Sequence, residues 1–404
     1  MRIKSIRVRN FKALRDVEMT NIPSFAVLVG ANGSGKSTFI GVFEFLKRCM
    51  HDNVKIALQQ MGGYEQTVSR GGEDEPIFIE LQIEMGIEAL NKSRLVTYTL
   101  EIVQKNRMVS VSKEYLRFKR GRQGAPYHFI RFENGAGEAL SEDFDGVFDE
   151  KVPLHQLERE EQTLDAPHIL ALKALGQFKR FDAASQLREL IENWNVTDLH
   201  IEDARREPDA ALAEHLSSTG DNIALYAQFL IEEHPDRFQE LVRKMSDRVP
   251  GVEQVLTEDI GDGRIALRFR DKAFDKGFLA RAVSDGTIKM FAYLALLTDP
   301  DPHPLLCIEE PENQLYPTLL PVLAEEFAAY ATARRGEGQV FVTTHSPDFL
   351  NSVPLASIYW LEKSDGFSVI KRAADDAQIQ ALVDEGDLPG WLWRQGLFTG
   401  VDPH

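Results

Sequence analysis

Residues 30–37, Gly-Ala-Asn-Gly-Ser-Gly-Lys-Ser, form the stretch with the clearest potential for chemistry. They match the pattern G-x-x-x-x-G-K-[ST], in which glycines let successive backbone N–H groups converge on phosphate oxygens. We expect the Lys36 ammonium to reach the β- and γ-phosphates of a nucleotide and the Ser37 hydroxyl to ligate Mg²⁺. The residues predicted to bind the nucleotide are Gly30, Asn32, Gly33, Ser34, Gly35, Lys36, Ser37 and Thr38.

A pair of carboxylates follows an apolar run much later in the chain. Residues 305–311 are Leu-Leu-Cys-Ile-Glu-Glu-Pro, which predicts a buried strand that ends in Glu309 and Glu310. We expect Glu309 to complete the Mg²⁺ site and Glu310 to polarise the attacking water as the catalytic base. A strand that merely ends in solvated acids is the alternative, and the phosphate-binding motif argues against it.

Two further motifs have a structural and a catalytic interpretation. The apolar run 339–344 ends at His345, which is either a polar cap of the strand or a contact to the γ-phosphate and its attacking water. Ser284, Asp285 and Gly286 precede the apolar helix predicted over 288–297. They either cap this helix or present a hydroxyl and N–H groups to a phosphate.

The elements around these motifs can be predicted from their periodicity. Residues 25–29 form a short apolar run and residues 38–46 have helical spacing, so the phosphate motif joins a strand end to a helix start. We expect the strand 305–310 to lie directly beside the strand 25–29, because the carboxylates would then face the phosphates. The strand 339–345 would lie beside that one.

The rest of the chain predicts an α/β protein with several parts. Residues 1–9 alternate like an edge strand, and four more segments alternate in a manner typical of an antiparallel meander with one wet face: 76–84, 95–103, 109–118 and 127–132. Helical spacing covers residues 155–248, and strands are expected at 252–256 and 265–270. We therefore predict an N-terminal ATPase lobe at 1–150, a helical lobe at 151–250, a C-terminal ATPase lobe at 251–365 and a tail at 366–404.

Composition limits the class of protein. The chain has 404 residues, of which 43% are hydrophobic and 27% are charged, as in ordinary soluble proteins. No apolar run approaches the roughly 18 residues of a membrane span, and the N-terminus lacks a signal-peptide pattern. Cys49 and Cys307 are too few and too isolated for a disulfide framework or a zinc site. We expect a cytoplasmic protein without a membrane partner.

The net charge of −17 argues against a surface covered in DNA-binding charge, because phosphate contacts need lysine and arginine. A local basic groove is still possible, although we favour the solvated face of a strand pair. Its candidate residues are Arg2, Lys4, Arg7, Arg9, Lys12 and Arg15, with Arg117, Lys119, Arg120 and Arg122. Residues 133–165 are acidic and predict a solvated loop with a helix start.

The order of these motifs resembles the ABC-type ATPases of the RecF, SMC and OLD group. It resembles most of all the compact bacterial proteins called AAA family ATPases, which lack a Toprim domain. The resemblance rests on the phosphate motif, Ser-Asp-Gly-Thr at 284–287, Ile-Glu-Glu-Pro-Glu-Asn at 308–313, Thr-Thr-His-Ser-Pro at 343–347, and the opening 6–12. It covers residues 1 to about 365 and, weakly, 388–400. It implies a P-loop NTPase head of the ABC type with a mixed sheet core, an antiparallel β meander and an inserted helical lobe.

The resemblance also implies an ATP-hydrolysing dimer. Two ATP molecules with Mg²⁺ would be held between two chains, with Ser284, Asp285 and Gly286 of one chain on the γ-phosphate held by the other. The dimer would switch a partner, such as a nuclease or toxin effector encoded nearby, in phage defence or DNA repair. The alternative is an ATP-gated DNA-binding clamp with a slow ATPase. A nuclease or a transporter subunit fits the motifs less well.

This sequence departs from the family pattern at several positions. Gln314 and Tyr316 stand where the family often has glycine and histidine, so that loop departs from the family pattern. Gln162 is the candidate for the glutamine-bearing loop of ABC proteins. The segment after His345 is shorter than a Toprim nuclease domain requires.

Overall fold

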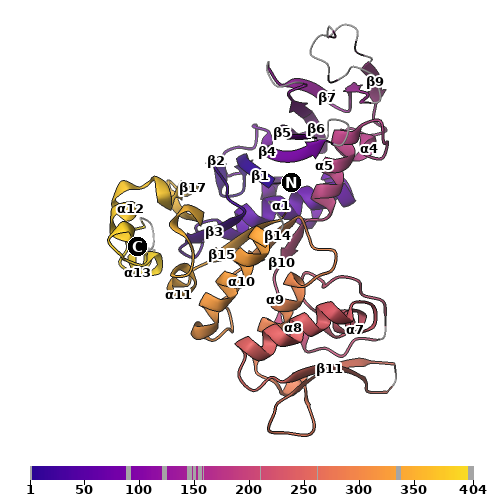
Figure 1. Cartoon of the computed structure of the whole chain (residues 1–404). Helices are drawn as coiled ribbons and strands as arrows, with labels where there is room; N and C mark the ends of the chain where they lie inside the picture. The colour runs from indigo at the N-terminus through magenta and orange to yellow at the C-terminus, as the bar shows by residue number, and fades with distance from the viewer. Residues whose placement is uncertain are drawn as a thin grey trace.

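The computed structural model of the chain describes residues 2–87, 92–120, 125–142, 148, 152, 157, 159–209, 211–261, 263–333 and 338–398. They form three β-sheets with helices packed between and around them. Figure 1 shows a β-rich N-terminal lobe at one end, a helical lobe with a small sheet at the other, and the C-terminal helices at the side. Arg122 and the acidic residues Asp143, Asp145, Asp149, Glu150 and Glu158 lie outside the described residues, as does Gly400.

A mixed sheet, which we call the parallel sheet, lies at the centre. Its order is β10-β14-β15-β3-β16-β17, and every pairing is parallel except that of β16 with β17. The strands are β3 (Phe25–Gly30), β10 (Asn195–Thr197), β14 (Leu305–Glu309), β15 (Gln339–Thr344), β16 (Ile358–Ser364) and β17 (Phe367–Arg372). Strands β3 and β15 are buried along their whole length, which explains their continuous apolar sequences.

The prediction that the strand 305–310 lies directly beside the strand 25–29 is wrong. Strand β14 does not pair with β3, because β15 lies between them and pairs with both. The crossover through α10 (Leu320–Ala333) returns the chain to the position next to β3. Since all three strands are parallel, their carboxyl ends still share one edge of the sheet.

A second sheet, the antiparallel sheet, has the order β2-β1-β4-β5-β6-β7-β8-β9. Its strands are β1 (Arg2–Phe11), β2 (Leu14–Met19), β4 (Ile77–Ile87), β5 (Lys92–Lys105), β6 (Met108–Phe118), β7 (Tyr127–Glu133), β8 (Ala136–Leu140) and β9 (Arg159–Thr163). The predicted meander is thus confirmed, and two short strands extend it. The prediction of an edge strand over residues 1–9 is wrong, because β1 pairs with β2 on one side and β4 on the other.

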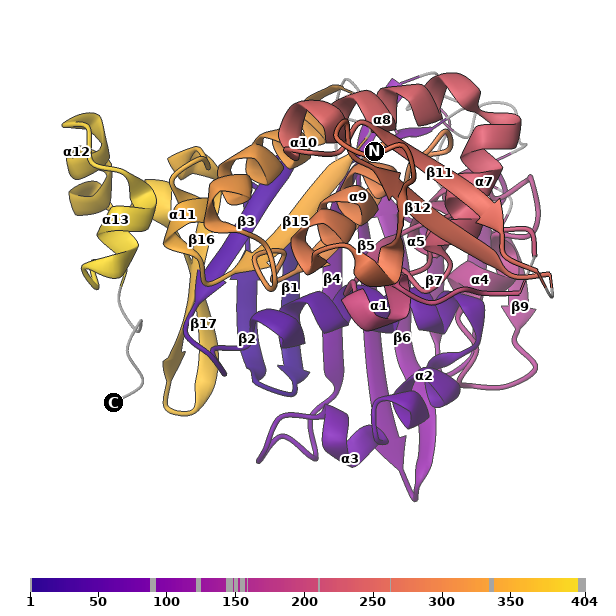
Figure 2. The ribbon, with the colours of Figure 1, turned by 90° about the horizontal axis from the view of Figure 1, so that it is seen from below.

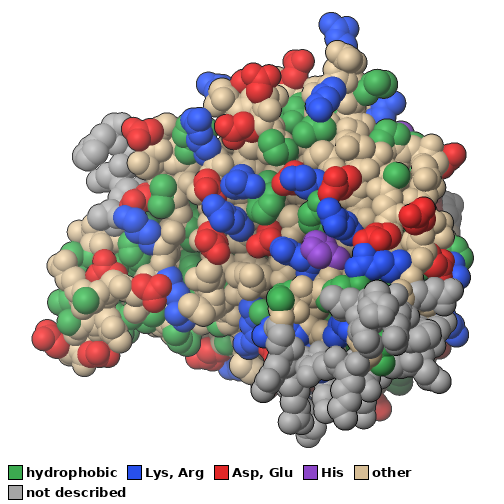
Figure 3. Space-filling model, turned by 90° about the horizontal axis from the view of Figure 1, so that it is seen from above, with side chains coloured by type: hydrophobic (Ala, Val, Ile, Leu, Met, Phe, Trp, Pro, Cys, Tyr) green, Lys and Arg blue, Asp and Glu red, His purple; other side chains and the backbone are tan. Residues whose placement is uncertain are grey.

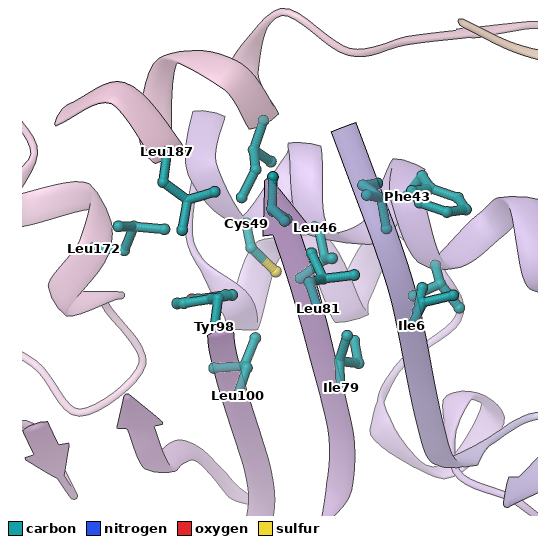
Figure 4. Packing of buried hydrophobic residues seen from close by; sticks show 14 of the residues in the cluster. Ile6, Phe43, Leu46, Cys49, Ile79, Leu81, Tyr98, Leu100, Leu172 and Leu187 are labelled. Carbon is teal, nitrogen blue, oxygen red and sulfur yellow. The ribbon is translucent and has the colours of Figure 1, made fainter. Parts of the chain in front are cut away.

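Helix α1 (Lys36–His51) packs between the two large sheets (Figure 2). The Phe43 ring lies 5.1 Å from that of Phe341 in the parallel sheet, and the Phe45 ring lies 5.7 Å from that of Phe11 in the antiparallel sheet. Figure 4 shows Leu46 and Cys49 of α1 beside Leu81 and Tyr98. Leu172 of α4 (Ala171–Leu175) and Leu187 of α5 (Asp182–Glu192) complete this cluster.

A second core holds the helical lobe. It comprises α6 (Ile201–Ala204), α7 (Ile223–Glu233), α8 (Pro235–Arg248), α9 (Asp285–Leu297) and a small sheet of β11 (Gln254–Asp259), β12 (Ile265–Arg270) and β13 (Phe278–Leu279). Short helices fill the remaining connections: α2 (Val54–Gln60), α3 (Tyr64–Thr67), α11 (Pro347–Leu350), α12 (Ala377–Asp384) and α13 (Pro389–Arg394). No helix among the described residues is long and apolar enough to cross a lipid bilayer.

The sheets do not follow the predicted division of the chain into four parts, because one predicted part contributes strands to two different sheets. Strands β9 and β10 both fall within residues 151–250, yet β9 extends the antiparallel sheet and β10 the parallel sheet. The segment is therefore not purely helical, and its two strands are too short to show a period-two pattern. Strand β17, which lies beyond residue 365, is also part of the parallel sheet. The fourfold division of the chain remains a prediction.

Glu114 of β6 provides a test of how this core is built. Its carboxylate is 1% exposed and accepts hydrogen bonds from the Tyr98 hydroxyl at 2.9 Å and from the backbone N–H groups of Ala171 and Leu172 at the start of α4. Burial raises the pKa of Glu114 from 4.5 to about 7, although these hydrogen bonds act to lower it. The folded chain therefore holds a proton that the unfolded chain releases near pH 4.5.

We predict that this group makes the protein less stable as the pH rises from about 5 to about 7.5, because the unfolded state ionises first. The urea midpoint measured across this range should fall less steeply for Glu114→Gln than for the wild type. Glu84→Gln is the control, since a hydrogen bond from Lys4 holds the pKa of the Glu84 carboxyl below its usual value, although burial acts to raise it. Equal slopes for Glu114→Gln and the wild type would contradict the prediction.

Candidate functional site

The phosphate motif forms a loop between the end of β3 and the start of α1. Gly33 and Gly35 have φ angles of 76° and 105°, which only glycine adopts readily. Among the described residues no side chain caps the N-terminus of α1, so its first N–H groups remain directed at the loop. A helix start of this kind attracts anions.

Ser368 of β17 supports this loop from behind. Its hydroxyl donates a hydrogen bond of 2.6 Å to the Ser34 carbonyl, and its own N–H donates to the Ala13 carbonyl. A Cβ on Gly35 would lie 2.1 Å from the Ser368 hydroxyl oxygen, and a Cβ on Gly30 would lie 2.6 Å from the Leu361 carbonyl oxygen. Both glycines are therefore needed for close packing, and no local sequence signal identified Ser368.

Lys36 crosses the loop. Its Nζ donates to the carbonyls of Gly30 at 2.8 Å and Ala31 at 3.3 Å, and lies 3.9 Å from Glu310 Oε1. Burial lowers the pKa of Lys36, while the neighbouring carboxylates raise it. The ammonium thus sits in a partly desolvated position beside the loop, where a charge interaction is stronger than in water.

Glu309 and Ser37 come together as the sequence predicts. Burial raises the pKa of Glu309, and a hydrogen bond with the Ser37 hydroxyl lowers it. A carboxylate and a hydroxyl are the hard oxygen donors that Mg²⁺ prefers. The donor set, the tight glycine loop and the uncapped helix start therefore fit a magnesium nucleotide.

Glu310 is held in an unusual backbone conformation. Its φ of 40° is rare for a residue other than glycine and costs on the order of 1–3 kcal/mol. The Glu310 N–H donates to the Thr343 carbonyl, and the Asn313 side chain donates to Glu310 Oε2 at 3.2 Å. The carboxylate consequently lies between Lys36 and His345, whose Nδ1 is 3.6 Å from Oε1.

Glu312 organises His345. The Glu312 side chain is 8% exposed, and its Oε1 accepts hydrogen bonds from the Thr344 hydroxyl at 2.8 Å and the His345 N–H at 2.7 Å. The same oxygen lies 3.2 Å from His345 Nδ1. A proton on Nδ1 would therefore point at Glu312 and leave Nε2 as the nitrogen that can accept one. Glu312 lies within the motif at 308–313, but its role was missed.

A cavity of about 610 Å³ opens beside these groups. Its lining residues are Ser37, Asp198, Leu199, His200, Lys289, Glu309, Glu310, Asn313 and Gln314. Lys289 of α9 donates a 2.7 Å hydrogen bond to the Asn313 carbonyl, and burial lowers its pKa. Asp198 and His200 follow β10. The periodicity of the sequence did not predict this strand, so these two lining residues were not predicted either.

Gln162 does not belong to the site, and its assignment to a glutamine-bearing loop is wrong. It lies on β9, the outermost strand of the antiparallel sheet, and lines a different hollow with Arg131 and Glu161. The segment that follows β10, with Asp198 and His200, occupies the wall beside Glu309 instead.

Residues 284–286 begin α9 as predicted, but they do not line the cavity beside the loop of their own chain. The Ser284 hydroxyl accepts from the Thr287 N–H, and Asp285 forms an ion pair of 2.6 Å with Arg205. Gly286 packs against the backbone of Gln314. Among the described residues that line the cavity of Ser37 and Glu309, none comes from 284–286.

Some of the candidate basic residues are paired with acids, and at the start of the chain these are Lys4 and Arg7. Figure 3 shows lysine and arginine interleaved with aspartate and glutamate on one face of the molecule. Pairs on the antiparallel sheet include Lys4 with Glu84, Arg7 with Asp16, and Arg117 with Glu80. This pattern is typical of a solvated strand face, as favoured from the sequence.

Two family models match the sequence. The one described as "AAA ATPase domain" matches residues 1–243, more than half of the chain. The one described as "AAA domain, putative AbiEii toxin, Type IV TA system" matches residues 173–351. A comparison with curated proteins gives no match.

Solved structures with a similar fold are heads of SMC proteins. One is the Smc head domain with an extended coiled coil bound to the C-terminal domain of ScpA, derived from Pyrococcus furiosus, with a TM-score of 0.52, 11% identity and coverage of 95% of this chain and 98% of that chain. Another is the SmcHead bound to the C-winged helix domain of ScpA, with a TM-score of 0.50, 13% identity and coverage of 92% and 97%. These identities establish the fold alone, and the predicted ABC-type head is confirmed.

We predict that Gly35→Ala weakens ATP binding at least tenfold, because the new Cβ meets the Ser368 hydroxyl in a strained backbone region that costs about 1–3 kcal/mol. Calorimetric titration with ATP and thermal melting measure this. Gly41→Ala is the control, since Gly41 lies within α1 with open space around it and alanine favours helix there by about 0.5–1 kcal/mol. Wild-type affinity in Gly35→Ala would show that the loop tolerates the side chain.

Proposed function

This chain belongs to the AAA ATPase domain family. We propose that it binds ATP with Mg²⁺ and, as a homodimer, hydrolyses the bond between the β- and γ-phosphates. The observation that carries the proposal is the Glu310 carboxylate, held by Asn313 between Lys36 and His345 beside the phosphate loop. A general base needs this kind of fixed position within reach of the water that it deprotonates.

Each residue has a defined part in the proposed reaction. The N–H groups of residues 33–38 and the Lys36 ammonium bind the phosphates, as the glycine conformations support. Ser37 and Glu309 hold Mg²⁺, which when bound offsets the negative charge of the phosphate oxygens. Glu310 takes the proton of the attacking water, and His345, oriented by Glu312, contacts the same water or the γ-phosphate.

The dimer is proposed from the position of Ser284, Asp285 and Gly286. These residues contact Thr287, Arg205 and Gln314 and do not themselves line the cavity beside the loop of their own chain. A second chain, placed head to tail, would bring them to the γ-phosphate. ATP then favours the closed pair, and hydrolysis releases it, which is a ligand-driven shift of population.

The movement of this dimer is proposed to switch an effector protein, such as a nuclease or toxin, in phage defence or DNA repair. The family model that names a Type IV TA system and covers residues 173–351 supports an effector system. The SMC heads with a similar fold are described as bound to ScpA, which supports a head that engages a partner. The clamp alternative receives less support, since three of its candidate basic residues, Lys4, Arg7 and Arg117, pair with acids.

The assignment of the base is tested with Glu310→Gln. We predict that this variant keeps ATP bound, stabilises the dimer and hydrolyses ATP about 100-fold more slowly or worse, because the water loses its proton acceptor. Phosphate release and light scattering with ATP measure the two effects. Lys36→Ala is the comparison, and we expect it to bind no ATP and to remain in the nucleotide-free state. Hydrolysis by Glu310→Gln at the wild-type rate would show that another group is the base.

The positioning role of Glu312 is tested with a double-mutant cycle. We predict that Glu312→Ala lowers kcat for ATP about ten- to a hundredfold with little change in KM, because His345 loses its fixed orientation. The double variant Glu312→Ala/His345→Ala should be no slower than His345→Ala, since both changes remove one unit. Additive losses would mean that Glu312 acts independently of His345. Thermal melting of each variant checks that the fold is intact.

A further inference from the structure

A second group of ligand-type side chains lies at the opposite edge of the parallel sheet. Asp299 and His303 belong to the connection between α9 and β14, just before the amino end of that strand, and His215 precedes α7 in the helical lobe. One nitrogen or oxygen from each side chain lies within 4.8 Å of the others. The sequence did not indicate this group, because 84 residues separate His215 from Asp299.

The carboxylate of the group is fixed in place. The Asp299 side chain is fully buried, and its Oδ1 accepts a 2.9 Å hydrogen bond from the Asp301 N–H. Its other oxygen, Oδ2, lies 3.0 Å from His215 Nδ1. This separation is close to the roughly 3.3 Å between two ligand atoms on a tetrahedral ion with bonds of about 2.0–2.1 Å.

His303 is oriented in the way that metal-binding histidines are. Its Nδ1 lies 3.1 Å from the Asn193 carbonyl oxygen, which can only accept, so Nδ1 carries the proton and Nε2 carries the lone pair. The Asn195 side-chain amide lies 3.0 Å from Nε2 and occupies that lone pair.

The group faces open space rather than packed core. A cavity of about 410 Å³ is lined by His215 and His303 together with Asn195, Asp301, and Glu44 of α1. It offers room for water at a further coordination position. His215 is 44% exposed at its side chain, so the ring can turn by the small amount that closes the ligand set.

We propose that His215, Asp299 and His303 form a binding site for a divalent transition-metal ion, with Zn²⁺ as the best match. Two imidazoles and one carboxylate suit zinc and its neighbours, whereas Mg²⁺ and Ca²⁺ prefer oxygen donors throughout. Binding displaces the Asn195 amide from His303 Nε2, at a cost of about one hydrogen bond. Cys49 and Cys307 take no part in this site. The number of cysteines, which argued against a zinc site with cysteine ligands, therefore does not apply to it.

The ion would join two parts of the fold that the sheets hold only indirectly. His215 leads into α7 of the helical lobe, while Asp299 and His303 lead into β14, the strand that carries Glu309. The segment before α7 would thus be fixed to the base of that strand. This inference rests on the residues of the group alone and does not depend on ATP hydrolysis.

The experiment is a Zn²⁺ titration of the full chain after treatment with a chelator, without nucleotide and with excess Mg²⁺ to occupy oxygen sites. We expect one equivalent of Zn²⁺ per chain by calorimetry and elemental analysis, and a visible spectrum with Co²⁺. His303→Gln, Asp299→Asn and His215→Ala should each weaken Zn²⁺ binding at least about tenfold. His234→Ala, a histidine of the helical lobe outside the group, should bind like the wild type.

Three results would overturn the proposal. One is a wild-type chain that binds no Zn²⁺ under these conditions. Another is a His215→Ala variant with wild-type Zn²⁺ affinity. The third is a Glu309→Gln variant that no longer binds Zn²⁺. His215→Ala carries the most weight, because this side chain is half-exposed, and melting of the metal-free variant measures the effect of losing its contact with Asp299. Glu309→Gln must retain the Zn²⁺ site, since loss of binding there would assign the ion to the phosphate-loop cavity instead.

Discussion

The position of α1 between two sheets is the constraint on which the rest of the structure depends. Phe39 and Phe43 pack on Phe341 of the parallel sheet, while Phe45 packs on Phe11 of the antiparallel sheet. A fully buried phenylalanine contributes about 1.5–3 kcal/mol, so this helix is anchored by several times the strain stored at one unusual backbone position. The phosphate loop is the continuation of α1, and its geometry is therefore set by the core.

The edge of the parallel sheet that carries Glu309 gathers more negative than positive charge. Asp198, Glu309, Glu310 and Glu312 lie around the cavity with Lys36 and Lys289 as the cations beside them. Burial acts on both signs, raising the pKa of Glu309 and lowering that of Lys36. Each shift reports a charge that is poorly solvated, and an excess of poorly solvated carboxylate favours the arrival of a cation. The site is thus suited to Mg²⁺ before any nucleotide is considered.

Motifs with a local physical basis could be predicted from the sequence, and those that depend on distant pairing could not. The glycine loop, Glu309 and Glu310 could be predicted because each lies at the end of a strand, and consecutive residues are enough to identify a strand and the turn after it. The insertion of β15 between β14 and β3 depends on which strands pair, and a period of two says nothing about neighbours. The contact of Glu312 with His345, the support of Gly35 by Ser368, and the wall formed by Asp198 all join residues far apart in the chain.

The hydrogen bond from the Ser368 hydroxyl to the Ser34 carbonyl joins residues that are 334 positions apart. This separation affects when the phosphate loop can form during synthesis of the chain. Gln339 makes a comparable link, since its side chain exchanges hydrogen bonds with the backbone of Ile3 over 336 positions. Long-range contacts of this kind form late, because the entropy of closing the intervening chain must be overcome first. Synthesis proceeds from the N-terminus, so a chain still on the ribosome carries residues 30–37 long before the hairpin that shapes them. A growing chain that has not yet reached Ser368 therefore carries the phosphate motif without the serine that supports its loop.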